Sequence, residues 1–147
     1  PRQLMSVARG GAVDQPIPMP CPACGQDGAA QLSQSARSGQ LRWSRSIDCP
    51  TCGVIEEDDI GFPPEPLREK ILQGFGRWTL VVGDADRLAA IGVVRSALKL
   101  SMQETAARKH AFPVLYIGTK AEAEWLGALM GASGIASEVT RMSEDGN

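Results

Sequence analysis

The chain has 147 residues, of which 43% are hydrophobic and 22% are charged, the balance of an ordinary globular protein. Its formal net charge of −2 gives no overall attraction to nucleic acid or to an anionic membrane. No apolar run approaches the roughly 20 residues that span a bilayer, and the opening residues PRQL lack the pattern of a signal peptide. We therefore expect a cytoplasmic protein without a membrane partner.

Residues 1–60 are predicted to form an N-terminal arm and a small β unit. The prolines of DQPIPMP (14–20) favour extended backbone and exclude a helix. Two short runs of alternating character follow, AQLSQSA and QLRWSRSI, and Ser38-Gly39 between them is typical of a hairpin turn. In the second run, alternate residues share one face of the predicted strand. One face carries Leu41, Trp43, Arg45 and Ile47, and Arg42 lies on the other.

A linker and a short helix are expected over residues 61–76. The Gly/Pro clusters of GFPPEP (61–66) break both helix and strand. The segment EPLREKILQGFG then reads as a helix, with Pro66 near its start and Gly74 near its end.

Residues 77–142 carry the clearest secondary-structure signals. RWTLVV predicts a strand, and Asp84 is a suitable N-cap for the helix that follows. Apolar residues recur at helical spacing in DADRLAAIGVVRSALKL, at Leu88, Ile91, Val94 and Leu98.

Two capping boxes mark further helices in this stretch. Ser101 with Glu104 precedes one helix, and Thr119 with Glu122 precedes another, whose apolar run ends before Gly134. FPVLYI and IASEV predict the remaining strands. The predicted order is β-α-α-β-α-β, followed by a tail over residues 143–147.

All four cysteines of the chain lie in two near-copies of one pentapeptide, CPACG (21–25) and CPTCG (49–53). Two thiolates on a tight turn can bind one ion, and two such turns supply the four ligands of a closed tetrahedral zinc site, formed by Cys21, Cys24, Cys49 and Cys52. The alternatives are two disulfides, which need an oxidising compartment, or a redox dithiol, which needs only one CxxC. An all-thiolate site has no open position, so we expect one structural Zn²⁺.

The cysteine segment resembles a zinc ribbon. Such ribbons occur in RNA polymerase subunits, transcription factors, ribosomal proteins and interaction modules. The resemblance implies a metal and a small β fold, and it leaves the function open.

Residues 77–142 resemble the C-terminal domain of the bacterial ribosomal stalk protein, and more distantly the Clp protease adaptor of the same fold. RLAAIGVVRSALKLSMQET resembles the first helix pair of the stalk domain, with matches at Ile91, Val94, Arg95, Leu100 and Glu104. GTKAEAEWLGALMGASGIASEV resembles its last helix and strand, with matches at Ala123, Glu124, Leu126, Met130 and Gly134. The resemblance covers under half of the chain.

In the stalk protein this domain recruits translational GTPases through its first two helices. The resemblance implies that a partner protein binds the matching face here, formed by Arg87, Leu88, Ile91 and Arg95. Gly92 and Ala106 stand where the family usually has lysine, which weakens the positive potential of that face. Cysteine-rich sequence stands where the stalk protein has its dimerisation helices and hinge, so we expect a relative that binds a different partner.

The Clp adaptor captures an N-terminal amine in an acidic pocket, and it too carries acidic residues after its first strand. Asp84 and Asp86 match that position. The alternative is that both aspartates cap a helix and favour the positive end of its dipole, and we prefer this interpretation.

A nucleic-acid site is the other hypothesis for the ribbon. No acidic residue occurs between Gly28 and Ile47. A protein that binds single-stranded nucleic acid could use the basic and aromatic residues of this stretch, which are Arg37, Arg42, Trp43 and Arg45. The alternative is that Trp43 covers the ribbon core while the arginines face solvent. The acidic run 56–59, which follows, is expected to be a solvated edge.

The sequence thus predicts an α+β protein, a small β zinc ribbon joined to a β-α-α-β-α-β domain of the stalk and Clp adaptor type. His110 is the only histidine, it lies near a helix end, and it lacks a nucleophile once the thiols bind metal. We expect a zinc-stabilised, non-catalytic adaptor that binds another protein. The alternative is a zinc ribbon protein associated with the ribosome or with RNA.

Overall fold

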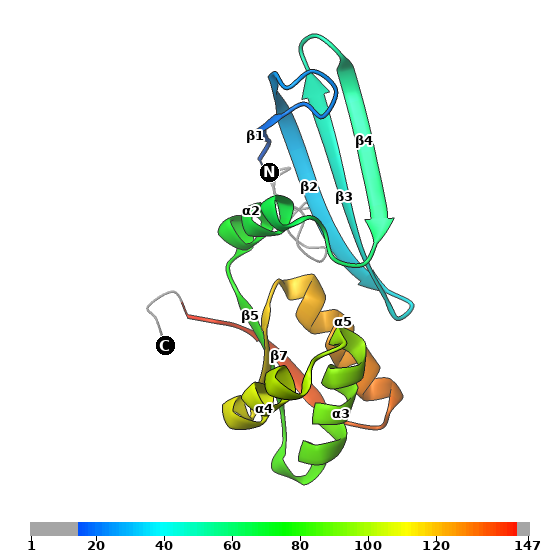
Figure 1. Cartoon of the computed structure of the whole chain (residues 1–147), viewed down its shortest axis with the longest axis vertical. Coiled ribbons are helices and arrows are strands. Elements are labelled where there is room, and N and C mark those ends of the chain that lie inside the picture. Colours follow the sequence, from blue (N-terminus) through cyan, green and yellow to red (C-terminus); the bar gives the residue numbers. More distant parts are fainter. Residues whose placement is uncertain (1–14, 144–147) are drawn as a thin grey trace, which may run out of the picture. The chain divides into compact units, whose positions relative to one another are not determined.

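The computed structural model describes residues 15–143, which form two compact units divided between Phe75 and Gly76 (Figure 1). Each unit contains one antiparallel sheet, and the fold is mixed α+β with four α-helices in the described residues. Within this part of the chain, no helix has the length and apolar character needed to cross a bilayer.

Unit 1 is built on a four-stranded sheet in the order β1-β2-β3-β4. Its strands are β1 (Ile17–Pro20), β2 (Asp27–Arg37), β3 (Gln40–Cys49) and β4 (Gly53–Ile60). The predicted hairpin turn is confirmed: Ser38 and Gly39 have φ of 53° and 76°, as a two-residue turn between twisted strands requires. Arg37 pairs with Gln40 directly across it.

Strands β1 and β4, the two edges of this sheet, carry weak strand signals in the sequence. Two of the four residues of β1 are prolines, which are tolerated only where the missing N–H faces away from the ladder, as at an edge. β4 contains four consecutive acids, a residue type depleted in strands. It forms because the second CPxCG turn reverses the chain and sets Gly53 opposite Cys49.

One face of the sheet in unit 1 carries the core. The helix α2 (Glu65–Phe75) packs there, and its Leu67 and Ile71 are buried with Leu32 and Ile47 of the sheet. The helix predicted within a linker therefore belongs to unit 1. The buried cluster is Met19, Cys21, Ala30, Leu32, Ile47, Cys49, Leu67 and Ile71.

Unit 2 has a three-stranded sheet in the order β6-β5-β7, with β5 antiparallel to both neighbours. In chain order its elements are β5 (Trp78–Val82), the 3₁₀ turn η1 (Asp84–Asp86), α3 (Arg87–Leu98), α4 (Met102–Ala111), β6 (Val114–Gly118), α5 (Lys120–Ala132) and β7 (Ser137–Arg141). The β-α-α-β-α-β order is as predicted. The strand β7 begins two residues later than the IASEV pattern, because Ile135 is buried in the core just after α5.

The predicted N-cap at Asp84 is wrong. Asp84 begins the 3₁₀ turn, and α3 starts only at Arg87, one turn later. Asp86 occupies the N-cap position of α3 with φ −105° and ψ 16°, and its side chain makes no capping hydrogen bond. Because the 3₁₀ turn absorbs the change of direction after β5, neither aspartate is needed as a cap.

Both predicted capping boxes are confirmed. The Ser101 hydroxyl accepts from the N–H of Glu104 at 3.0 Å, and the Glu104 carboxylate accepts from the N–H of Ser101 at 2.8 Å. The carboxylate lies at a helix start, and the backbone hydrogen bond from Ser101 holds the pKa of Glu104 below its usual value.

The second box also ties α5 to the sheet. Glu122 is fully buried, and its Oε1 accepts hydrogen bonds from the N–H of Thr119 at 3.1 Å and from the Tyr116 hydroxyl at 2.7 Å. Gly118 leaves the room for this arrangement, because a Cβ there would clash with Glu122 and Tyr116. The carboxyl of Glu122 thus joins a helix cap to strand β6.

We expect Glu122→Ala to lower the free energy of unfolding of unit 2 by about 1.5–3 kcal/mol, because two buried donors lose the carboxylate oxygen that accepts from both. Glu122→Gln keeps an acceptor oxygen in a side chain of the same shape, so it should lower the free energy of unfolding less than Glu122→Ala does. Urea unfolding followed by circular dichroism measures both, with the exposed neighbour Glu124→Ala as the control. Equal losses for the alanine and glutamine variants would contradict this role.

Candidate metal centre

The four cysteines occupy two similar turns at one end of unit 1. Cys21 follows β1, Cys49 ends β3, and Cys24 and Cys52 lie in the turns that lead into the next strands. Each turn ends in a glycine with positive φ, 81° at position 25 and 85° at position 53. Only glycine adopts this backbone without strain, so the motif sequence itself produces the turn that aims both thiols inward.

The four sulfur atoms converge on one point. All lie within 4.8 Å of one another, and the Sγ atoms of Cys24 and Cys49 are 3.6 Å apart. A tetrahedron with Zn–S bonds of about 2.3 Å has sulfur–sulfur edges of about 3.8 Å. All four cysteines are free of disulfides. The residues can therefore hold one metal ion, and both the donor set and the spacing suit zinc in a closed structural site.

Backbone hydrogen bonds assemble the two turns. The N–H of Cys21 donates to the C=O of Gln26 at 2.8 Å, and the N–H of Gly25 donates to the C=O of Cys21 at 2.8 Å. The Thr51 hydroxyl donates to Oε1 of Gln26 at 2.7 Å, which joins the second turn to the first. The chain therefore brings the turns together through its own hydrogen bonds as well as through the shared ligand site.

The electrostatics of the sulfur cluster favour a cation. The N–H of Cys24 donates to the sulfur of Cys21 and lowers the pKa of that thiol to about 7. The Cys52 thiol hydrogen-bonds to the sulfur of Cys24 and to those of the other two cysteines. These bonds stabilise its protonated form and raise the pKa of Cys52 to about 12. Four thiolates this close repel one another, so a divalent ion is needed before all four lose their protons, and its binding releases them.

The residues predicted to form a partner face lie on α3, and the structure corrects one of them. Arg87, Leu88 and Arg95 are exposed, and Leu88 presents 79% of its surface to solvent. Ile91 is only 4% exposed and belongs to the core of unit 2. Of the helical stripe that the sequence shows, Ile91 and Val94 are buried and Leu98 packs against the core, whereas Leu88 is exposed and Ala90 is buried in its place.

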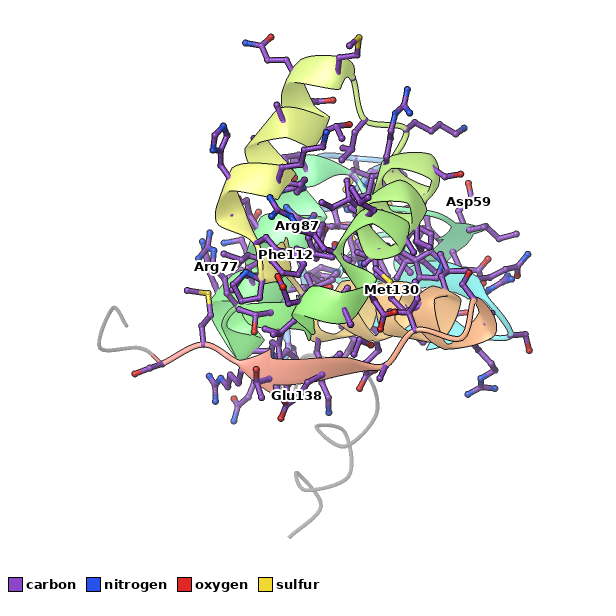
Figure 2. All side chains as sticks on the ribbon, turned by 90° about the horizontal axis from the view of Figure 1, so that it is seen from below. Asp59, Arg77, Arg87, Phe112, Met130 and Glu138 are labelled. Atoms are coloured by element: carbon purple, nitrogen blue, oxygen red, sulfur yellow. The ribbon has the colours of Figure 1, made fainter. Side chains whose placement is uncertain are left out.

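Further contacts surround this face. The guanidinium of Arg87 lies 5.2 Å from the centre of the Phe112 ring (Figure 2), a cation–π contact that holds the side chain beside α4. Met102, at the start of α4, is 83% exposed and was not predicted. Its position directly after the N-cap Ser101, outside any apolar stripe, was the signal in the sequence.

The four residues predicted for nucleic acid are not brought together. Trp43 and Arg45 share the core-side face of β3 with Ile47, whereas Arg37 and Arg42 lie on the other face. The guanidinium of Arg45 is paired with the carboxylate of Glu57 on β4. Trp43 packs against the core of unit 1. A single nucleic-acid strand could not contact all four side chains at once.

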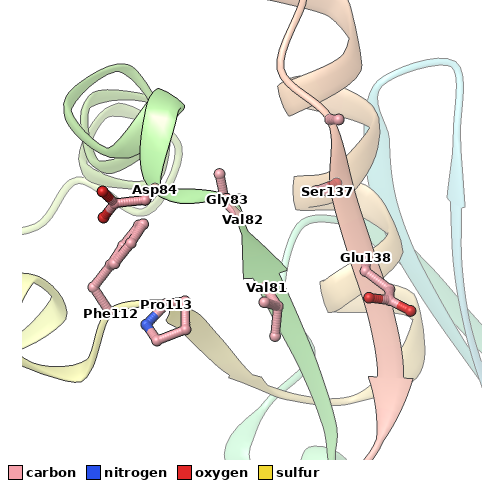
Figure 3. A pocket seen from close by; sticks show the side chains of 9 residues that line it. Val81, Val82, Gly83, Asp84, Phe112, Pro113, Ser137 and Glu138 are labelled. Atoms are coloured by element: carbon pink, nitrogen blue, oxygen red, sulfur yellow. The ribbon is translucent and has the colours of Figure 1, made fainter.

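An open groove lies in unit 2 where β5 ends and where β6 and β7 begin. Its volume is about 780 Å³. Asp84 and Phe112 lie on one side of it and Glu138 on the other, with Val81 between them (Figure 3). The groove therefore combines an apolar floor with two carboxylates.

Comparison with protein-family models, with curated proteins and with solved structures finds no significant match to this chain.

We expect the chain to bind one zinc per molecule, and chelation to unfold unit 1 while unit 2 stays folded. Two ligands belong to the small core of unit 1, whereas the core of unit 2 contains none. Plasma mass spectrometry gives the stoichiometry, and amide NMR signals report each unit separately.

Cys49→Ser should reproduce the effect of chelation, while Thr51→Ser in the same turn should keep both the metal and the hydroxyl that donates to Gln26. Unit 1 signals that persist after complete removal of metal would contradict a structural role for the ion.

Proposed function

We propose that this protein is a zinc-stabilised, non-catalytic adaptor that binds another protein through the exposed face of α3. The observation that carries the proposal is Leu88, a large apolar side chain that is 79% exposed between two arginines of the same helix. Exposed apolar residues ringed by charge are typical of interfaces. We call Arg87, Leu88 and Arg95 the α3 surface.

Charge at the α3 surface suits a partner with acidic residues. Neither Arg87 nor Arg95 forms an ion pair within residues 15–143. Arg87 donates to the backbone C=O of Lys109 at 3.4 Å and lies over the Phe112 ring, but these contacts leave its positive charge uncompensated, so both guanidinium groups can steer association. Leu88 together with these two arginines supports an apolar contact with a basic rim.

The resemblance to the ribosomal stalk domain agrees with this proposal. The β-α-α-β-α-β order of unit 2 is the order that the resemblance implies, and the α3 surface lies on the helix that the stalk protein uses for its partners. We therefore propose that unit 2 is a stalk-like binding domain with a changed partner, and that unit 1 is a zinc ribbon with one structural Zn²⁺ joined to it.

We expect the double variant Arg87→Glu/Arg95→Glu to weaken partner binding by about tenfold, because it replaces two attractive charges with two repulsive ones. The partner is first captured in the cells that make the protein, with a photo-crosslinking residue at position 88, and its affinity is then measured with purified proteins.

Arg37→Glu/Arg42→Glu is the matched control, since it makes the same change of charge on unit 1 and leaves the α3 surface unchanged. Affinity that falls with the control and not with the α3 variant would contradict the proposal and would favour the ribbon as the binding unit.

The alternative, a ribbon associated with the ribosome or with RNA, has less support. Its four residues are divided between two faces, and Arg45 is already paired with Glu57. The control variant above tests it directly, because Arg37 and Arg42 are the two members of the set on the free face. Salt-dependent RNA binding that is lost in that variant would favour this alternative.

The groove at the end of β5 supports a second candidate function, capture of a peptide amine as in the Clp adaptor. Asp84 begins the 3₁₀ turn and is not its N-cap, so the capping explanation does not apply, although an acid in the first turn still favours the positive end of the dipole. Asp84 also lines the groove with Glu138, beside the apolar Phe112 and Val81. Such a site would accept a cationic amine and an adjacent apolar side chain.

We expect a peptide that begins with phenylalanine to bind this groove, and its N-acetylated form to bind at least about tenfold more weakly, since acetylation removes the positive charge. Fluorescence anisotropy of labelled peptides measures both. Asp84→Asn/Glu138→Gln should abolish the difference, while Asp86→Asn, outside the groove, should leave it. Equal binding of the two peptides would exclude amine capture.

A further inference from the structure

The outer edge of β4 in unit 1 is an unpaired strand edge of unusual composition. The strand is eight residues long, and within residues 15–143 its one partner is β3. It carries exposed apolar residues at both ends, Val54 at 62% and Ile60 at 53% exposure, with the acidic run 56–59 between them. An open edge with apolar side chains is a template for another strand.

The hydrogen-bond register identifies which backbone groups face outward. The N–H of Gly61 donates to the C=O of Leu41 on β3 at 2.6 Å. Because successive residues of a strand direct these groups to opposite sides, the odd-numbered residues 53–61 pair with β3, and the even-numbered residues 54–60 point to the open edge. The N–H of Ile60 is taken by the Asp59 carboxylate at 2.8 Å, which leaves those of Val54, Glu56 and Asp58 for a neighbour.

The same even-numbered residues share one face of the sheet. Their side chains alternate with those of Ile55 and Glu57, which lie on the core side, where Glu57 pairs with Arg45. The outward face of β4 therefore reads apolar, acidic, acidic, apolar at alternate positions, which are Val54, Glu56, Asp58 and Ile60. Both acids are exposed, and neither forms an ion pair within the described residues.

This pattern selects one kind of occupant. A second copy of β4 in antiparallel pairing about Glu57 would set Glu56 against Asp58 twice, and like charges directly opposite each other are destabilising. RNA and anionic membranes are repelled by the same carboxylates. A strand with two basic residues at alternate positions would form two opposite-charge pairs instead.

We propose that β4 binds an extended basic segment of a partner protein, which adds as a fifth strand to the sheet of unit 1. Its backbone pairs with Val54, Glu56 and Asp58, its Lys or Arg side chains face the two acids, and apolar residues at its ends cover Val54 and Ile60. A shallow hollow of about 280 Å³ lies on the sheet beside β4, lined among others by Ser33, Ser44 and Ser46, and it gives long basic side chains hydroxyl groups to contact.

This surface lies on unit 1 and does not depend on the α3 surface of unit 2. The experiment titrates the zinc-loaded, ¹⁵N-labelled full chain with a synthetic peptide, acetyl-Thr-Val-Thr-Lys-Thr-Lys-Thr-Val-Thr-amide. The comparison peptide has glutamate in place of both lysines. We expect the lysine peptide to shift and protect the amides of residues 54, 56 and 58, and to bind at least tenfold more tightly than the glutamate peptide.

Two variants test the role of charge. Glu56→Lys/Asp58→Lys should reverse the preference between the peptides, and the milder Glu56→Gln/Asp58→Asn should abolish it without altering the fold. Glu65→Lys/Glu69→Lys on α2 makes the same total change of charge away from the edge and should preserve the preference.

Equal affinity for the two peptides would overturn the proposal, as would unchanged amide signals at residues 54, 56 and 58 or a preference that survives in the neutral variant. None of these outcomes bears on Arg87, Leu88 or Arg95, so the two interfaces are judged separately.

Discussion

The structure of unit 1 depends on the convergence of four cysteine sulfurs within 4.8 Å of one another. Each CPxCG turn contributes two of them, and the same turns start the strands β2 and β4. Because one turn joins β1 to β2 and the other joins β3 to β4, an ion held by all four sulfurs would fix both of these strand connections at once.

The two units are stabilised in different ways. Unit 1 combines a small apolar core with a ligand site, and two of its core residues are themselves cysteines. Unit 2 has a larger core of ten buried residues without any metal ligand, and a buried carboxyl that joins a helix cap to a strand. The proposed functions use neither core. They use three surface features, which are the α3 surface, the groove at Asp84 and the outer edge of β4.

The sequence predicted most where a local rule acts alone. The CPxCG turns, the Ser38-Gly39 hairpin and both capping boxes depend on nearby residues, and the structure contains all of them. Prediction failed where distant contacts decide. Asp84 has the chemistry of a cap, yet a 3₁₀ turn displaces the helix start. The acidic run 56–59 lies at a solvated sheet edge, as expected, but its pairing with β3 as a strand was not predicted, because acids are depleted in strands. The exposure of Leu88 depends on how α3 packs against α4 and α5, which spacing alone cannot fix.

The packing of α2 against the sheet has a consequence for how the protein is made. A ribosome releases the two CPxCG turns and all four strands of unit 1 before it releases residues 65–75. The sheet can bind its ion and pair its strands at that stage, but Leu32 and Ile47 have no cover until Leu67 and Ile71 arrive. For that interval the nascent chain exposes an apolar sheet face to every chaperone and neighbouring chain in the cell, and the helix that follows is what ends the exposure.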